Sequence, residues 1–192
     1  IGPNTFSGAY LDNGLGCFVA AEVARLIAER NPSLGDTLNL QFAFSSHEEI
    51  GRFGARICVA ECKPDILIAV DVNHDYESAP RVSAEKYQPL TMGDGMTLAC
   101  GSIVSEQLNA IICHAASQRN IPLQRDVRGR DTGTDAMGGV FGNVDCMATS
   151  VGFPIRNMHT QSELAHTGDV EACIEILYVA RYNYTMLSRK SS

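Results

Sequence analysis

The strongest constraint on the fold is a nearly continuous apolar run, DILIAVDVN, at residues 65–73. Branched aliphatic residues dominate it without polar alternation, which is typical of a strand that helices cover on both faces. A similar run, VDCMATSVGF, occupies residues 144–153, and LNLQFAFSS occupies residues 38–46. All three segments are bounded by turn-forming residues, so we predict three strands of a buried sheet.

Helical patterns separate these predicted strands. Residues 15–30 and 105–120 repeat apolar positions at helical spacing, residues 54–62 form a shorter helical pattern, and residues 168–187 form a closing one. Residues 76–101 are rich in Pro, Gly and Ser and are expected to be irregular. Alternating strands and helices favour a parallel sheet between helices. We therefore predict the α/β class, as a three-layer α/β/α sandwich with a mainly parallel central sheet.

Size and charge exclude several function classes. With 192 residues and 45% hydrophobic residues, the chain can bury a core and form one domain. Its net charge of −7, with scattered Lys and Arg, predicts neither nucleic acid nor a membrane surface as a partner. It has no apolar run of about 20 residues and no signal pattern, so we predict a cytoplasmic protein. Seven cysteines without paired spacing are expected to be buried free thiols.

Acidic residues follow the predicted strands. In open α/β sheets, ligands bind beyond the carboxyl ends of the strands. Glu48 and Glu49, Asp71 and His159 lie at or just after such ends, and Asp12 precedes the first helix. Taken singly, Asp12 is explained as a helix N-cap and the others as solvated loop residues. Taken together, these carboxylates and the imidazole suit a pair of zinc-like ions.

The adjacent glutamates Glu48 and Glu49 need not share a task. On an extended strand end, neighbouring side chains point to opposite sides. One can bind a metal, which relieves the repulsion between the two charges, while the other acts as a general base.

Five motifs in order resemble the glutamyl aminopeptidase family, the cobalt- or zinc-dependent tetrahedral aminopeptidases of the di-zinc exopeptidases. They are YLDNGLGC, SSHEEIGRFGAR, AVDVN, GTDA and RNMHTQSEL. Asp71 lies 22 residues after Glu49, and His159 lies 88 residues after Asp71, both close to the spacing in that family. The resemblance extends from about Asn4 to Leu177, which is nearly the whole chain.

The resemblance implies a role for each matching residue. Asp12 corresponds to a carboxylate that bridges two metal ions, zinc or cobalt. Glu49 and His159 correspond to the other ligands of one ion, and Asp71 to a ligand of the second. Glu48 corresponds to the general base. The implied activity is hydrolysis of N-terminal residues from peptides with a free N-terminus, by an intact protein that forms homo-oligomers.

Three further residues are expected near this site. The resemblance places Thr134 and Asp135, in the GTDA turn, beside the site as supporting residues. Glu163 follows His159 by four residues. It either orients the imidazole of His159, as carboxylates beside metal-binding histidines do, or is an exposed residue at a helix start.

The chain departs from the family pattern in two places. Asn13 and Gly14 stand where the family has an acidic residue and Arg. A His-x-Asp motif expected before Asp12 has no match, because every histidine follows Asp12. We therefore expect residues 1–192 to be a single catalytic domain that lacks its N-terminal segment and the inserted dimerisation domain. His74 is a candidate replacement ligand, although an ordinary loop histidine is the simpler interpretation.

Two other function classes compete with an active peptidase. A truncated, inactive aminopeptidase-like fragment would keep the fold and one metal. A glycosidase of the endoglucanase type would need two carboxyl groups about 5 to 9.5 Å apart across a sugar. Adjacent glutamates that point in opposite directions, with further Asp and His residues, suit metal ions better.

Overall fold

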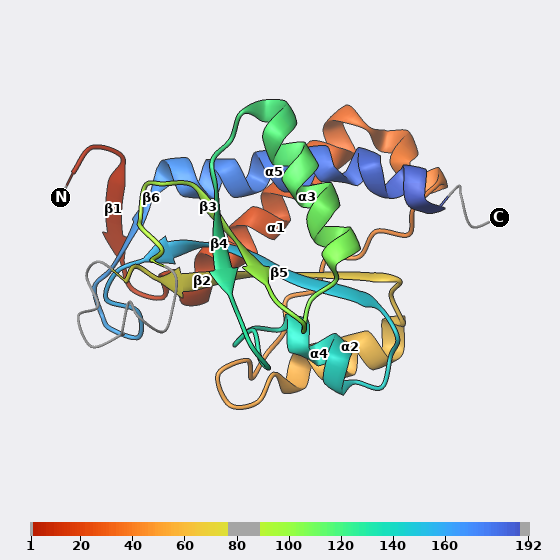
Figure 1. Cartoon of the computed structure of the whole chain (residues 1–192), viewed down its shortest axis with the longest axis horizontal. Coiled ribbons are helices and arrows are strands. Elements are labelled where there is room, and N and C mark those ends of the chain that lie inside the picture. Colours follow the sequence, from red (N-terminus) through yellow and green to blue (C-terminus); the bar gives the residue numbers. More distant parts are fainter. Residues whose placement is uncertain (1, 77–88, 189–192) are drawn as a thin grey trace.

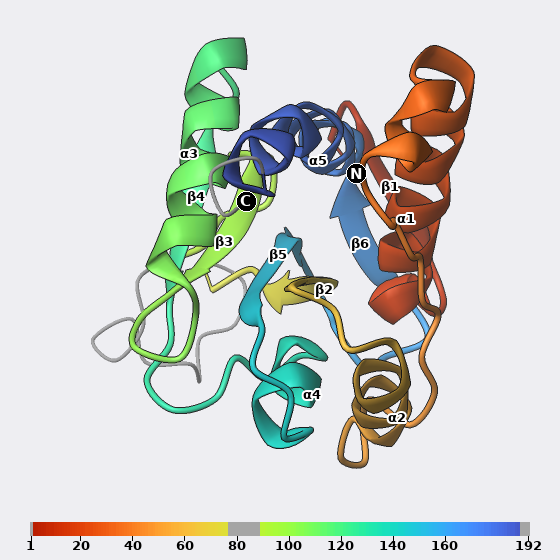
Figure 2. The ribbon, with the colours of Figure 1, turned by 90° about the vertical axis from the view of Figure 1, so that its right-hand side faces the viewer.

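The computed structural model describes residues 2–76 and 89–188. A central sheet lies between two helical layers, with α1, α3 and α5 on one face and α2 and α4 on the other (Figures 1 and 2). The elements in chain order are β1 (Thr5–Gly8), α1 (Leu11–Arg30), η1 (Pro32–Asp36), α2 (Phe53–Cys62), β2 (Ile66–His74), β3 (Met96–Cys100), α3 (Glu106–Arg119), β4 (Leu123–Val127), α4 (Ala136–Phe141), β5 (Met147–Ile155), β6 (Glu163–His166) and α5 (Thr167–Ser188). The predicted α/β sandwich is confirmed.

The central sheet has the strand order β2-β5-β3-β4. β2 and β5 pair in parallel from Ile66 opposite Met147 to His74 opposite Ile155. β3 and β4 are also parallel to each other, whereas β3 and β5 are antiparallel. The sheet is therefore mainly parallel, and the carboxyl ends of β2 and β5 lie at the same edge. A separate ribbon joins β1 and β6 in antiparallel fashion.

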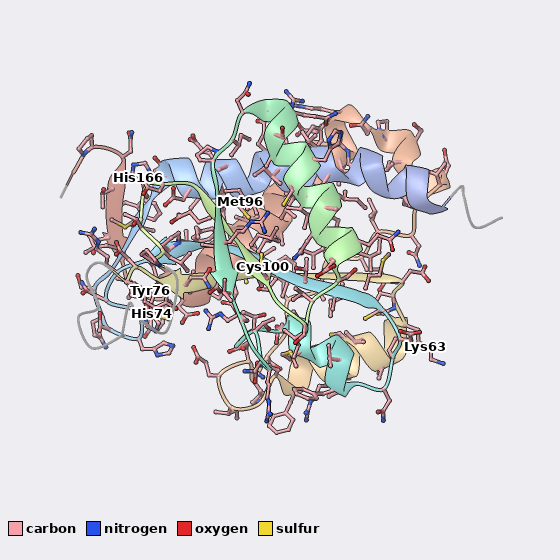
Figure 3. The ribbon with its side chains drawn as sticks, viewed as in Figure 1. Lys63, His74, Tyr76, Met96, Cys100 and His166 are labelled. Carbon is pink, nitrogen blue, oxygen red and sulfur yellow. The ribbon has the colours of Figure 1, made fainter. Side chains whose placement is uncertain are left out.

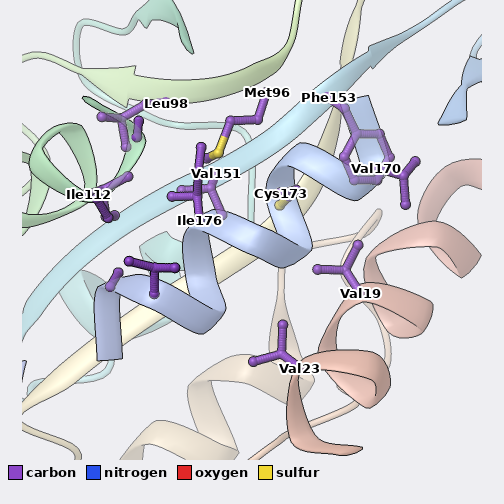
Figure 4. Close-up of a cluster of buried hydrophobic side chains, with 14 of the residues drawn as sticks. Val19, Val23, Met96, Leu98, Ile112, Val151, Phe153, Val170, Cys173 and Ile176 are labelled. Atoms are coloured by element: carbon purple, nitrogen blue, oxygen red, sulfur yellow. The ribbon is translucent and has the colours of Figure 1, made fainter. Parts of the chain in front are cut away.

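The main hydrophobic core lies between the sheet and the layer of α1, α3 and α5. Val19 of α1, Ile112 of α3 and Ile176 of α5 are buried there. They meet Leu98 of β3 and Val151 of β5 in the same cluster (Figure 4). Because β5 lies between the other strands and under α5, its residues from Ala148 to Ile155 are all buried, as the continuous apolar run predicts.

β2 crosses the molecule from one side to the other. It begins soon after Lys63, which ends α2 in the left-handed conformation, and reaches His74 at the opposite side (Figure 3). The predicted limits, residues 65–73, differ from the observed ones by one residue at each end.

Two predictions about strands are wrong. Residues 38–46 form no strand, because no described segment forms a ladder with them and alternation alone cannot hold a strand. Residues 76–101 are not wholly irregular, since they contain the buried strand β3; residues 77–88 lie outside the described part. The short elements β1, β4, β6 and α4 also escape the sequence patterns, because four to six residues give too little periodicity.

All seven cysteines are free, as predicted. Cys17 and Cys62 are exposed and four others are partly exposed, so the expectation of burial is confirmed for Cys173 alone. Among the described residues, no helix combines the length and the apolar content that a bilayer crossing requires.

Candidate metal centre

Three residues from distant parts of the chain converge at one point. Asp12 lies in the first turn of α1, Glu49 in the turn before α2, and His159 after β5. The His159 Nε2 atom is 3.0 Å from Asp12 Oδ2 and 3.3 Å from Glu49 Oε1. One ligand atom from each of the three lies within 4.8 Å of the others. The structure thus brings together three of the four residues predicted as metal ligands.

The spacing of these atoms fits a divalent ion. Ligand atoms about 2.1 Å from a tetrahedral zinc ion are roughly 3.4 Å apart, close to the 3.0 and 3.3 Å that separate His159 Nε2 from the two carboxylate oxygens. Carboxylate oxygens and imidazole nitrogens are both zinc ligands, and catalytic zinc sites have three protein ligands and keep a further position open. The side chains of Glu49 and His159 are 61% and 59% exposed, so solvent and a substrate have access.

Hydrogen bonds made by Asp12 and by the next residue, Asn13, hold Asp12 in place. The Asn13 side chain donates to the Val70 carbonyl of β2 (2.8 Å) and accepts from the Gly16 N–H (2.9 Å). The Asp12 N–H donates to Glu163 Oε2 (3.1 Å). Asp12 and Asn13 leave helical geometry, so these contacts, and not the helix, fix the carboxylate. Asn13 therefore supplies an anchor that its residue type alone did not predict.

Glu163 also holds the His159 backbone. Its Oε1 atom accepts from the His159 N–H at 2.9 Å, while its other oxygen accepts from Asp12. Glu163 is only 2% exposed and begins strand β6. The interpretation as an exposed residue at a helix start is therefore wrong. The carboxylate contacts the backbone of His159, not its imidazole, and this backbone has a left-handed φ of 63°.

Asp71 lies within β2 and not at its end, because the strand continues to His74. The carboxyl group is buried, and burial raises its pKa to about 8, with the charges of Glu48, Asp12 and Asp135 acting in the same direction. Its Oδ1 atom accepts from the Val72 N–H at 2.9 Å. A buried carboxyl group among other carboxylates lacks a compensating cation, and a divalent ion would provide one.

Glu48 lies beside the converging residues and has a different partner. Its Oε1 atom is 3.4 Å from Arg52 Nε, and Arg52 Nη1 is 3.0 Å from Asp131. Burial and the charge of Asp135 raise the pKa of Glu48, while Arg52 opposes this shift. Arg52 was not predicted from the sequence, although its spacing of four residues from Glu48 is a signal for such a pair.

The GTDA turn lies near Glu48. Asp135 accepts a hydrogen bond from Ser45, and burial raises the pKa of Asp135. Thr134 is 4% exposed and its hydroxyl accepts from the Ala136 N–H at the start of α4 (3.3 Å). Asp135 acts on Glu48 and Asp71 through its charge, whereas Thr134 stabilises the turn that carries it.

His74 is outside the converging set. It is largely exposed at the end of β2. Partial loss of hydration of its ring, together with the charges of His159 and Arg128, lowers its pKa. Among the described residues, the group whose ligand atoms converge is formed by Asp12, Glu49 and His159 without it.

The converging residues line a cavity of about 310 Å³. Its walls are Tyr10, Asp12, Glu49, His159, Thr160, Gln161 and Glu163. Tyr10, Thr160 and Gln161 were not predicted from the sequence, because they carry no charge that would indicate a site. A larger hollow of about 430 Å³ lies near the opposite ends of β2 and β5, beside Asp65 and Met147. It contains none of the converging residues.

Comparison with known proteins supports the resemblance. The family model described as M42 glutamyl aminopeptidase matches residues 2–176. The lysyl aminopeptidase of Pyrococcus furiosus is 31% identical over 172 residues, which cover 89% of this chain and 46% of that protein. A TET aminopeptidase from a marine-sediment Thaumarchaeota archaeon has a TM-score of 0.74 at 22% identity, covering 91% of this chain and 48% of that one. The TET1 peptidase of Pyrococcus horikoshii has a TM-score of 0.71 at 20% identity, covering 91% and 49%.

The structural similarity and the family match support different conclusions. The structural neighbours are below 25% identity and show the fold alone. The family model, by contrast, covers most of the sequence. The chain spans about half the length of the relatives it matches. On the match over residues 2–176, it belongs to the M42 glutamyl aminopeptidase family.

Proposed function

We propose that this chain is the metal-binding part of an aminopeptidase that hydrolyses N-terminal residues from peptides with the help of divalent metal ions. The observation that carries the proposal is the convergence of Asp12, Glu49 and His159 in a chain of the M42 family. Their donor types and separations suit zinc, and cobalt has similar ligand preferences.

The proposed ligands form two sets that share Asp12. Asp12, Glu49 and His159 would hold one ion, and Asp12 with Asp71 would hold the second. Bound ions of this kind polarise the scissile carbonyl group and make water a stronger acid. The second set has no imidazole among its two residues, so we expect it to bind its ion more weakly than the first.

Glu48 is the residue to which we assign proton transfer. Its carboxylate is paired with Arg52. It is therefore not one of the converging ligands, which are Asp12, Glu49 and His159. Burial raises its pKa, which helps a carboxylate to hold a proton between two steps. We propose that Glu48 takes a proton from the attacking water and passes it to the nitrogen of the leaving amine.

Peptides with a free N-terminus suit the charge of the cavity. Asp12, Glu49 and Glu163 line it. Asp12 and Glu49 are proposed metal ligands, which leaves Glu163 as the carboxylate that can attract the N-terminal ammonium group of a peptide. We propose neither nucleic acid nor a membrane surface as a partner, because the net charge of −7 opposes binding to polyanions.

We further propose that residues 1–192 form one catalytic domain, and that the intact protein has an additional N-terminal segment and an inserted dimerisation domain. The support is the coverage of only 46% and 49% of two relatives. Homo-oligomer formation is proposed from the TET1 peptidase, which can assemble into a tetrahedron or a large octahedral shell. The seven free cysteines favour a cytoplasmic location.

The test separates metal binding from turnover. The purified chain is stripped with EDTA, reloaded with zinc or cobalt, and assayed with leucine- and glutamate-anilides and for bound metal. Glu48→Gln should keep the metal and, in the intact enzyme, abolish turnover, because an amide cannot accept the proton. Glu49→Gln should lower metal occupancy instead. The control is Glu22→Gln on the exposed face of α1. Equal loss of metal in the Glu48 and Glu49 variants would refute the division of roles.

The same assay decides between the alternatives. An inactive fragment would bind one ion and hydrolyse no anilide; the half-length match favours this outcome for the chain by itself. A glycosidase would release sugar from a glucan and not amine from an anilide. Robust turnover with two tightly bound ions would mean that another group, such as His74, completes the second ligand set.

A further inference from the structure

Arg52 lies between two carboxylates that come from different turns of the chain. Its Nε atom is 3.4 Å from Glu48 Oε1, and its Nη1 atom is 3.0 Å from Asp131 Oδ2. Glu48 belongs to the turn before α2, and Asp131 belongs to the loop before α4. The two helices pack side by side on one face of the sheet (Figures 1 and 2). Arg52 therefore joins the turn that carries Glu48 to the loop that carries Asp131.

Asp131 is held within its own loop. While its Oδ2 atom accepts from Arg52, its Oδ1 atom accepts from the Gly133 N–H at 2.7 Å. The bond to Gly133 sets the direction of the carboxylate. A planar guanidinium group that meets an acceptor fixed in this way keeps little rotational freedom. Asp131 thus determines where the remaining N–H groups of Arg52 point.

The backbone of Arg52 directs its side chain back to Glu48. The N–H groups of Gly51 and Arg52 both donate to the Glu48 carbonyl, at 3.1 and 3.0 Å. Arg52 has a left-handed φ of 57°, a conformation that is unfavourable for a residue with a Cβ atom and that glycine adopts freely. Ion pairs as exposed as those of Arg52 add little to stability. Fold stability therefore does not explain an arginine at this position.

Glu48 is close enough to the proposed metal ligands for their charges to interact. Burial raises the pKa of Glu48, and the charges of Asp135 and Glu49 act in the same direction. Burial likewise raises the pKa of Asp71, and the charge of Glu48 adds to this shift. A carboxylate so close to a divalent ion can bind it as a further ligand. Once bound to the metal, it would no longer be free to accept a proton from water.

We propose that Arg52, held by Asp131, is a positioning residue that keeps the Glu48 carboxylate out of the metal-ligand set. The proposal rests on the proposed function, because it takes Glu49 as a metal ligand and Glu48 as the residue that transfers the proton. Without the guanidinium group, the Glu48 side chain can turn toward the ion and bind it beside Glu49. Arg52 therefore gives the two adjacent glutamates their different tasks.

Calorimetric titration of the EDTA-stripped full chain with zinc tests this inference without a measurement of turnover. In the wild-type background, Glu48→Gln should leave the zinc affinity of the tighter site unchanged. In the Arg52→Met background, Glu48 becomes a ligand, so Glu48→Gln should lower that affinity about tenfold, the lower end of the range for groups that support a metal site. Arg52→Lys keeps the charge but not the planar fork, so the effect of Glu48→Gln should be smaller there. In the Asp131→Asn background it should also be smaller, because Arg52 remains but is held less firmly.

Arg56→Met is the matched control. Arg56 lies one turn further along α2, where its guanidinium group is 5.4 Å from the centre of the Phe141 ring. Its replacement removes the same charge as Arg52→Met but leaves Glu48 in place. Glu48→Gln should therefore have no effect on zinc affinity in the Arg56→Met background. Circular dichroism checks the fold of every variant.

Glu49→Gln separates a failure of this inference from a failure of the proposed function. Because Glu49 is a proposed ligand, its replacement should lower the zinc affinity in every background. If it does so while Glu48→Gln has no effect in the Arg52→Met background, the inference is overturned and the ligand set stands. An equal effect of Glu48→Gln in the Arg52→Met and Arg56→Met backgrounds would also overturn it, since only net charge would then matter. If Glu49→Gln leaves the zinc affinity unchanged, the proposed ligand set fails and the inference fails with it.

Discussion

Replacing Glu163 should weaken the fold and the metal centre together. This buried carboxylate accepts two hydrogen bonds, from the Asp12 N–H at 3.1 Å and from the His159 N–H at 2.9 Å. It therefore joins the start of α1 to the turn after β5, and these two segments supply two of the three converging ligands. The informative variants are Glu163→Gln, which keeps one acceptor oxygen, and Glu163→Ala, which removes both.

The geometry sets the size of the effect. In Glu163→Gln, one backbone N–H faces an NH₂ group and loses its partner; hydrogen bonds to charged groups contribute about 1.5–3 kcal/mol each. We expect a loss of about 2–3 kcal/mol, or about 1 M in the urea midpoint. Glu163→Ala leaves two donors unpaired in a site that is 2% exposed, so its loss should be about twice as large. Since domains are stable by only about 5–15 kcal/mol, that variant comes close to unfolding.

Urea unfolding of the metal-free protein measures the first effect, and calorimetric titration with zinc measures the second. Glu163→Gln should bind zinc more weakly, because Asp12 and His159 are held less firmly. Glu22→Gln is the control: Glu22 pairs with Arg25 on the surface of α1, and its loss should change neither property. If Glu163→Gln has the urea midpoint and the zinc affinity of the wild type, Glu163 does not hold the two ligand-bearing segments together.

Three further predictions concern packing, protonation and metal content. Gly16→Ala should cost about 1–3 kcal/mol in urea unfolding, because the new Cβ would lie 2.6 Å from the Val70 carbonyl oxygen. Gly14→Ala, which meets nothing within 4 Å, should cost nothing; equal losses would contradict this account. Burial raises the pKa of Asp71 to about 8. The stability that its protonated form gives to the metal-free chain is therefore complete below about pH 4 and lost as the pH rises through about 8. Asp71→Asn should flatten the dependence of the urea midpoint on pH between 5 and 9 in EDTA, and parallel wild-type and variant curves would rule it out. Native mass spectrometry of the zinc-loaded chain should show one ion retained on dilution and a second one lost, whereas two equally retained ions would contradict the ligand count.

Local patterns in the sequence determined most of the long elements. The apolar run at residues 65–73 became β2, and the helical spacing at residues 105–120 became α3, because burial on two faces or on one face leaves its own periodicity in the sequence. The order of the acidic residues along the chain also indicated which of them belong to one site. Asp12, Glu49 and His159 all belong to the predicted set, and the structure places them together.

Only the tertiary structure decided which of these patterns found a partner. Residues 38–46 alternate as a strand should, yet they form none, because a strand exists through the hydrogen bonds of its neighbour, and no described segment supplies them. No pattern in the sequence shows whether Glu163 is a surface residue or a buried carboxylate that joins two segments. Its role depends on two N–H groups, one of them 151 residues away. Asp71, likewise, became a buried group with a raised pKa through neighbours on other elements. The sequence by itself determined which residue types are available; the contacts between distant segments determined which of them meet, because hydrogen bonds and charges act through space and not along the chain.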